Sequence, residues 1–172
     1  MIDCAWLPDL FPYDGAKEWK AHEGNLYEVF KRDFIVTRPK MLEKNVNIRK
    51  HPMENDKEEA FYHVTCQDYF HVNDRVPDMR RCERIRWVRK MIENHACTPN
   101  RCINCDGMKM WVEKKGSDMR WHILLEAERY MVVVAERADY CLLITAFYVD
   151  QDHRLQQILS RFEKAKRQRA PT

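Results

Sequence analysis

The sequence predicts an α+β domain: an antiparallel β-meander sheet with helices before it and one helix closing it. In the second half of the chain, runs rich in β-branched and aromatic residues follow one another across short turns. Consecutive strands joined in this way pair antiparallel. The amphipathic segments precede and follow these runs instead of alternating with them, which distinguishes an α+β fold from an α/β fold.

Length and composition are those of a single globular domain covering residues 1–172. Hydrophobic residues make up 45% of the chain and charged residues 33%, a balance typical of folded proteins. The first ten residues lack the basic and apolar regions of a signal peptide, and no apolar run reaches the roughly 20 residues of a membrane span. We therefore expect a cytoplasmic protein with no membrane partner, whose seven cysteines are reduced, buried or metal-bound.

The first half of the chain is expected to hold two helices and two strands. Residues 15–34 carry apolar side chains at helical spacing. Residues 44–50 alternate between polar and apolar side chains, and residues 60–66 are rich in aromatic and β-branched ones, so both are predicted strands. Asp78 is a suitable N-cap for a helix over residues 78–94, because its carboxylate can accept hydrogen bonds from the first-turn amides.

The second half is expected to form the meander and the closing helix. The predicted strands are residues 108–113, 121–126, 130–135 and 140–149, and the predicted helix is residues 151–169. Thr145 interrupts the apolar run of the last strand. A hydroxyl inside a central strand needs a hydrogen-bond partner, so Thr145 is either a satisfied core residue or a site residue.

Two polar side chains share one face of the predicted strand 60–66. His63 and Thr65 stand two residues apart, and side chains at this spacing in a strand point the same way. An imidazole titrates near neutrality and can act as a general acid or base. A histidine in a strand is more often structural, and the neighbouring threonine makes a site more plausible.

Arginines are concentrated in the predicted helix 78–94. Arg80 and Arg84 lie one helical turn apart, as do Arg81 and Arg84. Guanidinium groups bind phosphate bidentately and stabilise developing negative charge in phosphoryl transfer. The alternative is a solvated helix face that Glu83 and Glu93 partly neutralise.

A second histidine lies on the strand that enters the hairpin. Arg120 and His122 are again two residues apart and share a face. Metal-free RNA cleavage needs one group to deprotonate the 2′-hydroxyl and another to protonate the leaving 5′-oxygen, so His122 is a reserve candidate for the second role. The alternative is a charged strand face at the edge of the sheet.

A cysteine-rich segment at residues 95–107 reads as an insertion between the helix and the sheet. Its imidazole and thiols fit a tetrahedral structural zinc site with the ligands His95, Cys97, Cys102 and Cys105. Cys82, in the preceding helix, is a substitute fourth ligand. Reduced free thiols or a disulfide are the alternatives.

The last strand also carries a family resemblance. Its run Leu-Leu-Ile-Thr145-Ala-Phe147-Tyr148, after a strand such as residues 130–135, resembles the barnase–EndoU–colicin–RelE superfamily of metal-independent RNases, in its phage- and toxin-associated branches. The resemblance implies a RelE- or barnase-like fold, and site roles for His63, an arginine of the 80–84 cluster, Thr145 and the aromatic residue after it. The family pattern has tyrosine where this chain has Phe147. In a regular strand Tyr148 points the other way, unless a β-bulge turns it.

The resulting hypothesis is an endoribonuclease of toxin or phage-conflict type that cleaves RNA, with tRNA among the candidate substrates, without a catalytic metal. His63 would transfer protons, Arg84 with Arg80 or Arg81 would neutralise the phosphate, Thr145 would hydrogen-bond it and Phe147 would stack on a base. An antitoxin or immunity protein is the expected partner. The rival hypotheses are a zinc-stabilised module that binds RNA or protein without catalysis, and an inhibitor that copies the nuclease fold.

Overall fold

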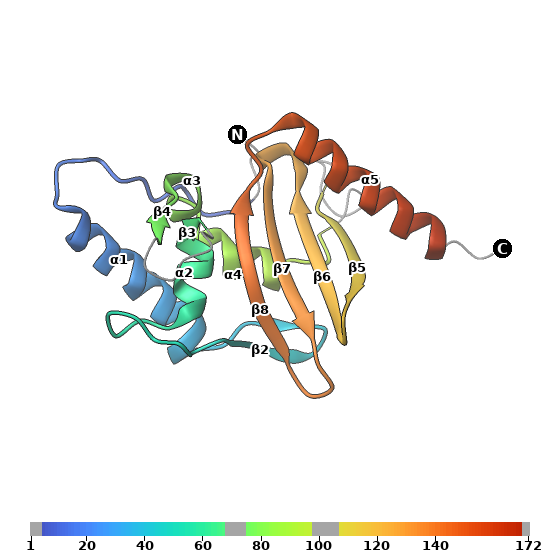
Figure 1. Cartoon of the computed structure of the whole chain (residues 1–172), viewed down its shortest axis with the longest axis horizontal. Helices are drawn as coiled ribbons and strands as arrows, with labels where there is room; N and C mark the ends of the chain where they lie inside the picture. Colours follow the sequence, from blue (N-terminus) through green and yellow to red (C-terminus); the bar gives the residue numbers. More distant parts are fainter. Residues whose placement is uncertain (1–4, 68–74, 98–106, 170–172) are drawn as a thin grey trace.

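The structure is a computed structural model that describes residues 5–67, 75–97 and 107–169, and these residues form an α+β fold (Figure 1). The helices in these ranges are α1 (Trp19–Lys31), α2 (Glu59–Thr65), α3 (Met79–Cys82), α4 (Ile85–Glu93) and α5 (Asp152–Arg169), with a π-helical turn η1 (Arg32–Val36) and a 3₁₀ turn η2 (Glu126–Glu128). The six-stranded sheet has the spatial order β1 (Lys40–Met41), β2 (Lys44–Ile48), β8 (Cys141–Tyr148), β7 (Tyr130–Glu136), β6 (Asp118–Leu125), β5 (Lys109–Lys115). A separate ladder pairs β3 (Cys66–Gln67) with β4 (Val76–Pro77).

The large sheet is mixed, which departs from the expectation of an antiparallel β-meander sheet. Strands β5 to β8 pair antiparallel in chain order. Strand β2, however, pairs in parallel with β8, with Val46 opposite Cys141 and Ile48 opposite Leu143. The chain leaves β2 through the helices, enters the sheet again at its far edge in β5, and returns strand by strand until β8 lies beside β2. The relative direction of β2 and β8 therefore depends on the whole connection between them.

The sheet separates two hydrophobic clusters. Ile123 and Val132 face the larger cluster, which α1, α2 and α4 cover, while their neighbours Leu124 and Val133 face the smaller one beneath α5. This alternation is the two-residue period of a strand, and it confirms that the apolar runs of the second half are strands buried on both faces. In Figure 1, α5 crosses the sheet after β8, and Ile158 is its buried anchor. No helix in the described ranges is long and apolar enough to span a bilayer.

The segment predicted as a strand at residues 60–66 is the helix α2, so that prediction is wrong. Its aromatic and β-branched side chains are buried because α2 packs against α1 and β8. Phe61 makes an edge contact with Phe30, the two ring centroids being 5.6 Å apart. Thr65 completes the helix by donating its hydroxyl hydrogen to the main-chain oxygen of Phe61 at 2.8 Å. Burial on several sides thus outweighs the strand propensity of these residues, and His63 and Thr65 do not share a face.

The helix predicted at residues 78–94 is two helices, α3 and α4, with a break at Glu83 and Arg84. Asp78 is the N-cap of α3, as predicted, and its carboxylate accepts hydrogen bonds from the amides of Arg80 and Arg81. At the break, the main-chain oxygen of Glu83 accepts a hydrogen bond from the amide of Phe11 at 2.7 Å. The N-terminal segment therefore satisfies a carbonyl that a continuous helix would have satisfied itself.

Candidate functional site

A groove of about 580 Å³ opens between α3, the end of β8 and the start of α5. Its lining residues are Gln67, Asp78, Arg80, Arg81, Phe147, Tyr148, Asp150 and Arg154. This volume is in the range of about 300–1,000 Å³ that is usual for ligand sites. Arg80, Arg81 and Phe147 were singled out from the sequence, so three predicted site residues meet in one groove.

A β-bulge in β8 decides which aromatic residue reaches which face. Val133 pairs with Thr145 and Val134 pairs with Leu143, so Ile144 has no partner of its own on β7. After this extra residue, Tyr148 packs with the same cluster as Leu143. The bulge thus turns Tyr148 toward the helices α1–α4, which a regular strand would not do.

Each aromatic residue at the end of β8 has two guanidinium groups near its ring. The ring centre of Tyr148 is 4.8 Å from the Arg80 guanidinium carbon and 4.9 Å from that of Arg84. Phe147 has Arg81 at 5.8 Å and Arg154 at 5.3 Å. These are cation–π distances, and they hold the arginines beside flat apolar surfaces.

The main-chain oxygen of His63 joins α2, α3 and β8 beside this groove. Thr145 donates its hydroxyl hydrogen to that oxygen at 2.8 Å, and the Arg81 guanidinium donates to it at 3.0 Å. Three residues that the sequence analysis selected from distant segments therefore come together. The end of α2 is held at a set position relative to the groove.

The His63 side chain is half-buried and lies beside a carboxylate. Its Nε2 is 3.2 Å from Oε1 of Glu59, one turn earlier in α2. Arg49 lies on the other oxygen of Glu59, with Nε at 3.9 Å from Oε2. A carboxylate partner orients an imidazole. Thr65, by contrast, is buried and bonded within its own helix.

Arg84 is buried, which corrects its expected role as the main phosphate ligand. Its guanidinium forms an ion pair with Glu83 and donates to the main-chain oxygen of Arg80 at 3.1 Å. Its guanidinium carbon is also 5.0 Å from the Trp87 ring centre and 4.9 Å from that of Tyr148. Arg84 is not among the lining residues of the groove, so it contacts Tyr148 from the protein interior.

His122 lies on the other face of the sheet, in the cluster beneath α5. Its ring stacks on Trp111 with 5.0 Å between the centroids. Arg161 reaches from α5 to within 3.5 Å of Nε2, and the same arginine pairs with Glu113. Burial lowers the pKa of His122 to about 4. His122 therefore does not join His63, and the structure gives no support to a shared proton-transfer pair.

The predicted zinc ligands are only partly within the described residues. Nδ1 of His95 lies 2.8 Å from the main-chain oxygen of Ile92, which leaves Nε2 as the nitrogen open to a metal. Cys97 is a partly exposed free thiol, whereas Cys102 and Cys105 lie outside the described residues. In the described ranges, no three histidine, cysteine or acidic residues group as metal ligands.

Cys82 does not suit the part of a substitute zinc ligand. It is buried, and its thiol donates a hydrogen bond to the main-chain oxygen of Thr65 at 3.3 Å. Burial raises the pKa of the Cys82 thiol, and its bond to Thr65 commits the thiol within the fold.

The groove is also lined by Arg154, Asp150 and Gln67, which were not predicted from the sequence. Arg154 and Asp150 flank the start of α5, directly after the strand that carries Phe147. A basic residue in the first turn of a helix that directly follows a site strand can be predicted to line the site, because that turn stays beside the end of the strand. Gln67 has no such signal, since its position depends on the β3–β4 ladder.

No protein-family model, curated protein or solved structure shows significant similarity to this chain. Its function is therefore argued from the groove itself.

Proposed function

We propose that this chain is an endoribonuclease that binds single-stranded RNA in the groove and cleaves it by transesterification without a metal ion. One observation supports the proposal above the others. Two aromatic rings, Phe147 and Tyr148, line a groove of about 580 Å³, and each has two arginines within cation–π distance. Aromatic rings stack on unpaired bases, and guanidinium groups bind the phosphates between them.

The charge of the groove suits a polyanion. Arg80 and Arg154 are exposed, and Arg81 is half-buried. Asp78 is largely committed to capping α3 and lies 3.5 Å from Nε of Arg81. Asp150 is the exposed carboxylate at the groove. Two of the three arginines that line the groove thus have no carboxylate partner among the described residues and can bind phosphate oxygens.

The chemistry proposed is an attack by the 2′-hydroxyl of RNA on the adjacent phosphorus. A base takes the 2′-hydroxyl proton, the new P–O2′ bond closes a 2′,3′-cyclic phosphate, and the P–O5′ bond breaks as an acid protonates the leaving oxygen. We assign one proton transfer to His63, with Glu59 orienting its ring. Because His122 lies on the other face of the sheet, Asp150 is our candidate for the second transfer.

Thr145 and Arg81 are the positioning pair in this proposal. Both bond to the main-chain oxygen of His63, so they set where the end of α2 lies relative to the groove. Arg81 keeps further N–H donors for a phosphate, since one terminal nitrogen makes this bond. The biological setting we propose is a cytoplasmic toxin or phage-conflict effector with a neutralising antitoxin or immunity protein.

The decisive experiment incubates the purified protein with total RNA and with a single-stranded oligonucleotide, and then identifies the fragment ends. We expect 2′,3′-cyclic phosphate ends, cleavage in the presence of EDTA, and no cleavage at a site that carries a 2′-deoxy sugar. His63→Ala should abolish cleavage, and His51→Ala, at an exposed histidine away from the groove, should not. Cleavage by His63→Ala at the wild-type rate would refute the assignment.

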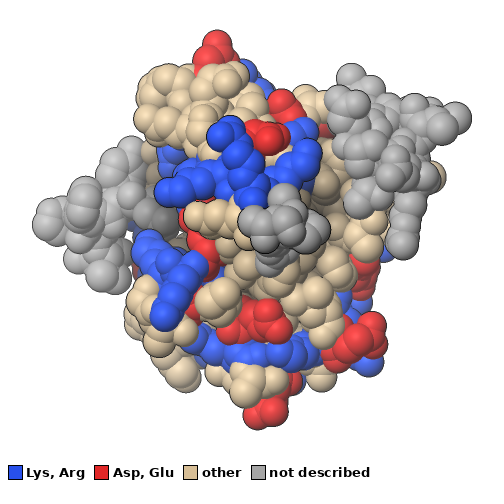
Figure 2. Space-filling model, turned by 90° about the vertical axis from the view of Figure 1, so that its right-hand side faces the viewer, with Lys and Arg blue, Asp and Glu red and all other residues tan. Residues whose placement is uncertain are grey.

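A non-catalytic RNA-binding module is the second candidate, and the basic end of α5 favours it. Arg161, Lys164, Lys166 and Arg167 are exposed along this helix. Figure 2 faces the side on which α5 ends and shows Lys and Arg atoms gathered there, with acidic atoms among them. This candidate predicts RNA binding without fragments, and expression that does not arrest the host. The nuclease predicts fragments and arrest.

A further inference from the structure

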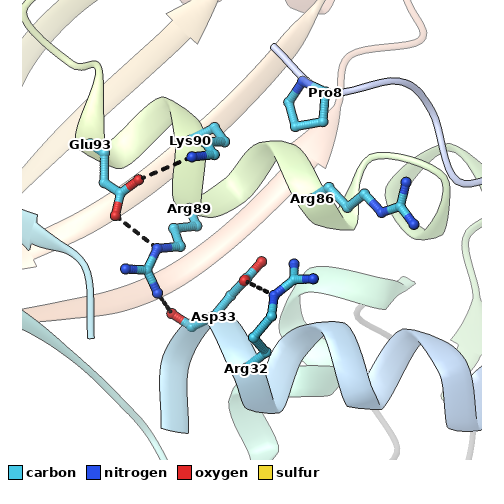
Figure 3. Close-up of a pocket in the computed structure, with 7 residues that line it drawn as sticks. All are labelled: Pro8, Arg32, Asp33, Arg86, Arg89, Lys90 and Glu93. Atoms are coloured by element: carbon cyan, nitrogen blue, oxygen red, sulfur yellow. Dashed lines mark hydrogen bonds and ion pairs between the residues drawn. The ribbon is translucent and has the colours of Figure 1, made fainter. Parts of the chain in front are cut away.

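A second pocket, of about 430 Å³, lies between the end of α1, the turn η1, α4 and the N-terminal segment (Figure 3). Its lining residues are Pro8, Arg32, Asp33, Arg86, Arg89, Lys90 and Glu93. None of them lines the groove described above. Four of the seven are cations and two are carboxylates, so the pocket has an excess of positive charge.

The walls of this pocket are held by hydrogen bonds. Arg89 donates to the main-chain oxygen of Asp33 at 2.9 Å and to the hydroxyl of Thr37 at 2.6 Å, which ties α4 to η1. On the other side, the Trp87 indole donates to the main-chain oxygen of Pro8 at 2.8 Å, which ties the N-terminal segment to α4. The cations therefore lie on main-chain segments that are already held in place, so ligand binding would not have to order these segments.

Both carboxylates of the pocket already have cationic partners. Asp33 is buried and accepts from Nε of Arg32 at 2.8 Å. Glu93 accepts from Nε of Arg89 at 2.7 Å. In Figure 3, Arg32 and Asp33 come from the helix below, and Arg32 extends toward α4. These two pairs account for two of the four cations.

The remaining cationic groups are available to an anion. Arg86 lies over the ring of Phe11, with 4.4 Å to its centre, and pairs with no carboxylate among the described residues. The Lys90 ammonium forms an ion pair with Glu93 at 3.8 Å, longer than a hydrogen bond, and shares that carboxylate with Arg89. Arg32 binds Asp33 through Nε and keeps its two terminal nitrogens. These groups offer two positive charges beyond the internal pairs.

We propose that this pocket is a phosphate-binding site for a phosphorylated ligand, with phosphate oxygens held by Arg86, Lys90 and the terminal nitrogens of Arg32. Guanidinium and ammonium donors on a fixed frame are the chemistry that recognises phosphate. The pocket volume exceeds that of a bare phosphate, so the ligand carries more than the phosphate group. Both nucleotides and the backbone of a nucleic acid carry phosphate groups that such donors bind. The site is independent of cleavage in the groove.

The test is isothermal titration calorimetry of the full chain at low salt with three probes: adenosine 5′-monophosphate, pyrophosphate and adenosine. We expect the two phosphorylated probes to bind and adenosine not to bind. Arg86→Gln and Lys90→Gln should each weaken binding by about tenfold, the effect of one charge-assisted hydrogen bond. Lys20→Gln, an exposed lysine of α1 outside the pocket, should bind like the wild type. A short RNA without a terminal phosphate that competes with the monophosphate would identify backbone phosphate as the source.

The variants also distinguish phosphate binding in this pocket from phosphate binding in the groove. Arg154→Gln removes a groove cation, and the binding of the monophosphate that remains in this variant should be the part that Lys90→Gln weakens. Binding that Arg154→Gln abolishes and Lys90→Gln preserves would overturn the proposal, as would a lack of heat with both phosphorylated probes. Arg86→Gln also loses its contact with Phe11. Lys90 is exposed, so Lys90→Gln remains a valid test if Arg86→Gln does not fold.

Discussion

Thr145 donates its hydroxyl hydrogen to the main-chain oxygen of His63 at 2.8 Å, a bond between two residues that are 82 positions apart in the chain. The acceptor lies near the end of α2, and the donor follows the β-bulge of β8. Arg81 donates to the same oxygen at 3.0 Å. The threonine is therefore a satisfied strand residue, and the bond ties β8 to the end of α2 two residues before Phe147, which lines the groove.

Thr145→Val is expected to lower the free energy of unfolding by about 1 kcal/mol, the net value of one hydrogen bond. The loss stays small because Arg81 still satisfies the oxygen of His63. The rate of RNA cleavage should fall by roughly tenfold or more, since the end of α2 is no longer tied to β8. Urea unfolding and fragment analysis measure the two effects.

Thr65→Val is the matched control for that change. Its hydroxyl bonds within α2, so stability should change by less than about 1 kcal/mol and cleavage should persist. If both variants reduced cleavage equally, the bond between Thr145 and His63 would have no special role.

Phe147→Leu is expected to weaken binding of a single-stranded RNA oligonucleotide. Base stacking on an aromatic ring contributes about 1–3 kcal/mol, which corresponds to roughly 5- to 150-fold in Kd. Fluorescence anisotropy at fixed salt measures the affinity. Tyr140→Leu is the control, because Tyr140 is an exposed aromatic residue before the opposite end of β8. Equal affinities of wild type and Phe147→Leu would count against base stacking in the groove.

His122 is expected to make stability depend on pH. Burial lowers its folded pKa to about 4, from an ordinary value near 6.5. Between these values the unfolded chain binds a proton that the folded chain does not, so the free energy of unfolding falls as pH falls. The full effect is about 3 kcal/mol across this range.

The measurement compares urea unfolding of the wild type and His122→Gln from pH 7.5 to pH 4. The neighbouring groups Glu113, Arg161 and Arg120 are common to both proteins, so the difference isolates the imidazole. His153→Gln, at an exposed histidine of α5, should follow the wild type. Parallel pH profiles for the wild type and His122→Gln would show that His122 is not the titrating group.

Zinc remains a prediction for the cysteine-rich segment. We expect one zinc per chain in the purified protein, and a lower melting temperature after treatment with a chelator. RNA cleavage should continue in short assays, because the proposed chemistry uses no metal. His95→Gln should reduce the zinc content, while His51→Gln should not. A metal-free protein whose melting temperature is unchanged by chelator would leave His95 and Cys97 without this role.

Local patterns in the sequence predicted many of the strands and helices of the fold. The alternation that places Ile123 and Leu124 in different clusters is visible in the strand itself, as are the Asp78 cap and the amphipathic helix α5. These features depend on residues within a few positions of one another. The main-chain oxygen of His63 brings together Arg81 and Thr145, two residues that were chosen for their chemistry. Arg80 and Arg81 are among the residues that line the groove, whereas His63 and Thr145 are not.

What the sequence determined by itself is thus the α+β class, the run of antiparallel strands and three of the residues that line the groove. Only the tertiary structure decided that residues 59–65 are helical, that Ile144 is a bulge and that Arg84 is buried. It also placed His122 beneath α5, away from His63. The physical reason is common to all four. Each depends on burial or hydrogen bonds between segments far apart in the chain, which no local pattern of residues encodes.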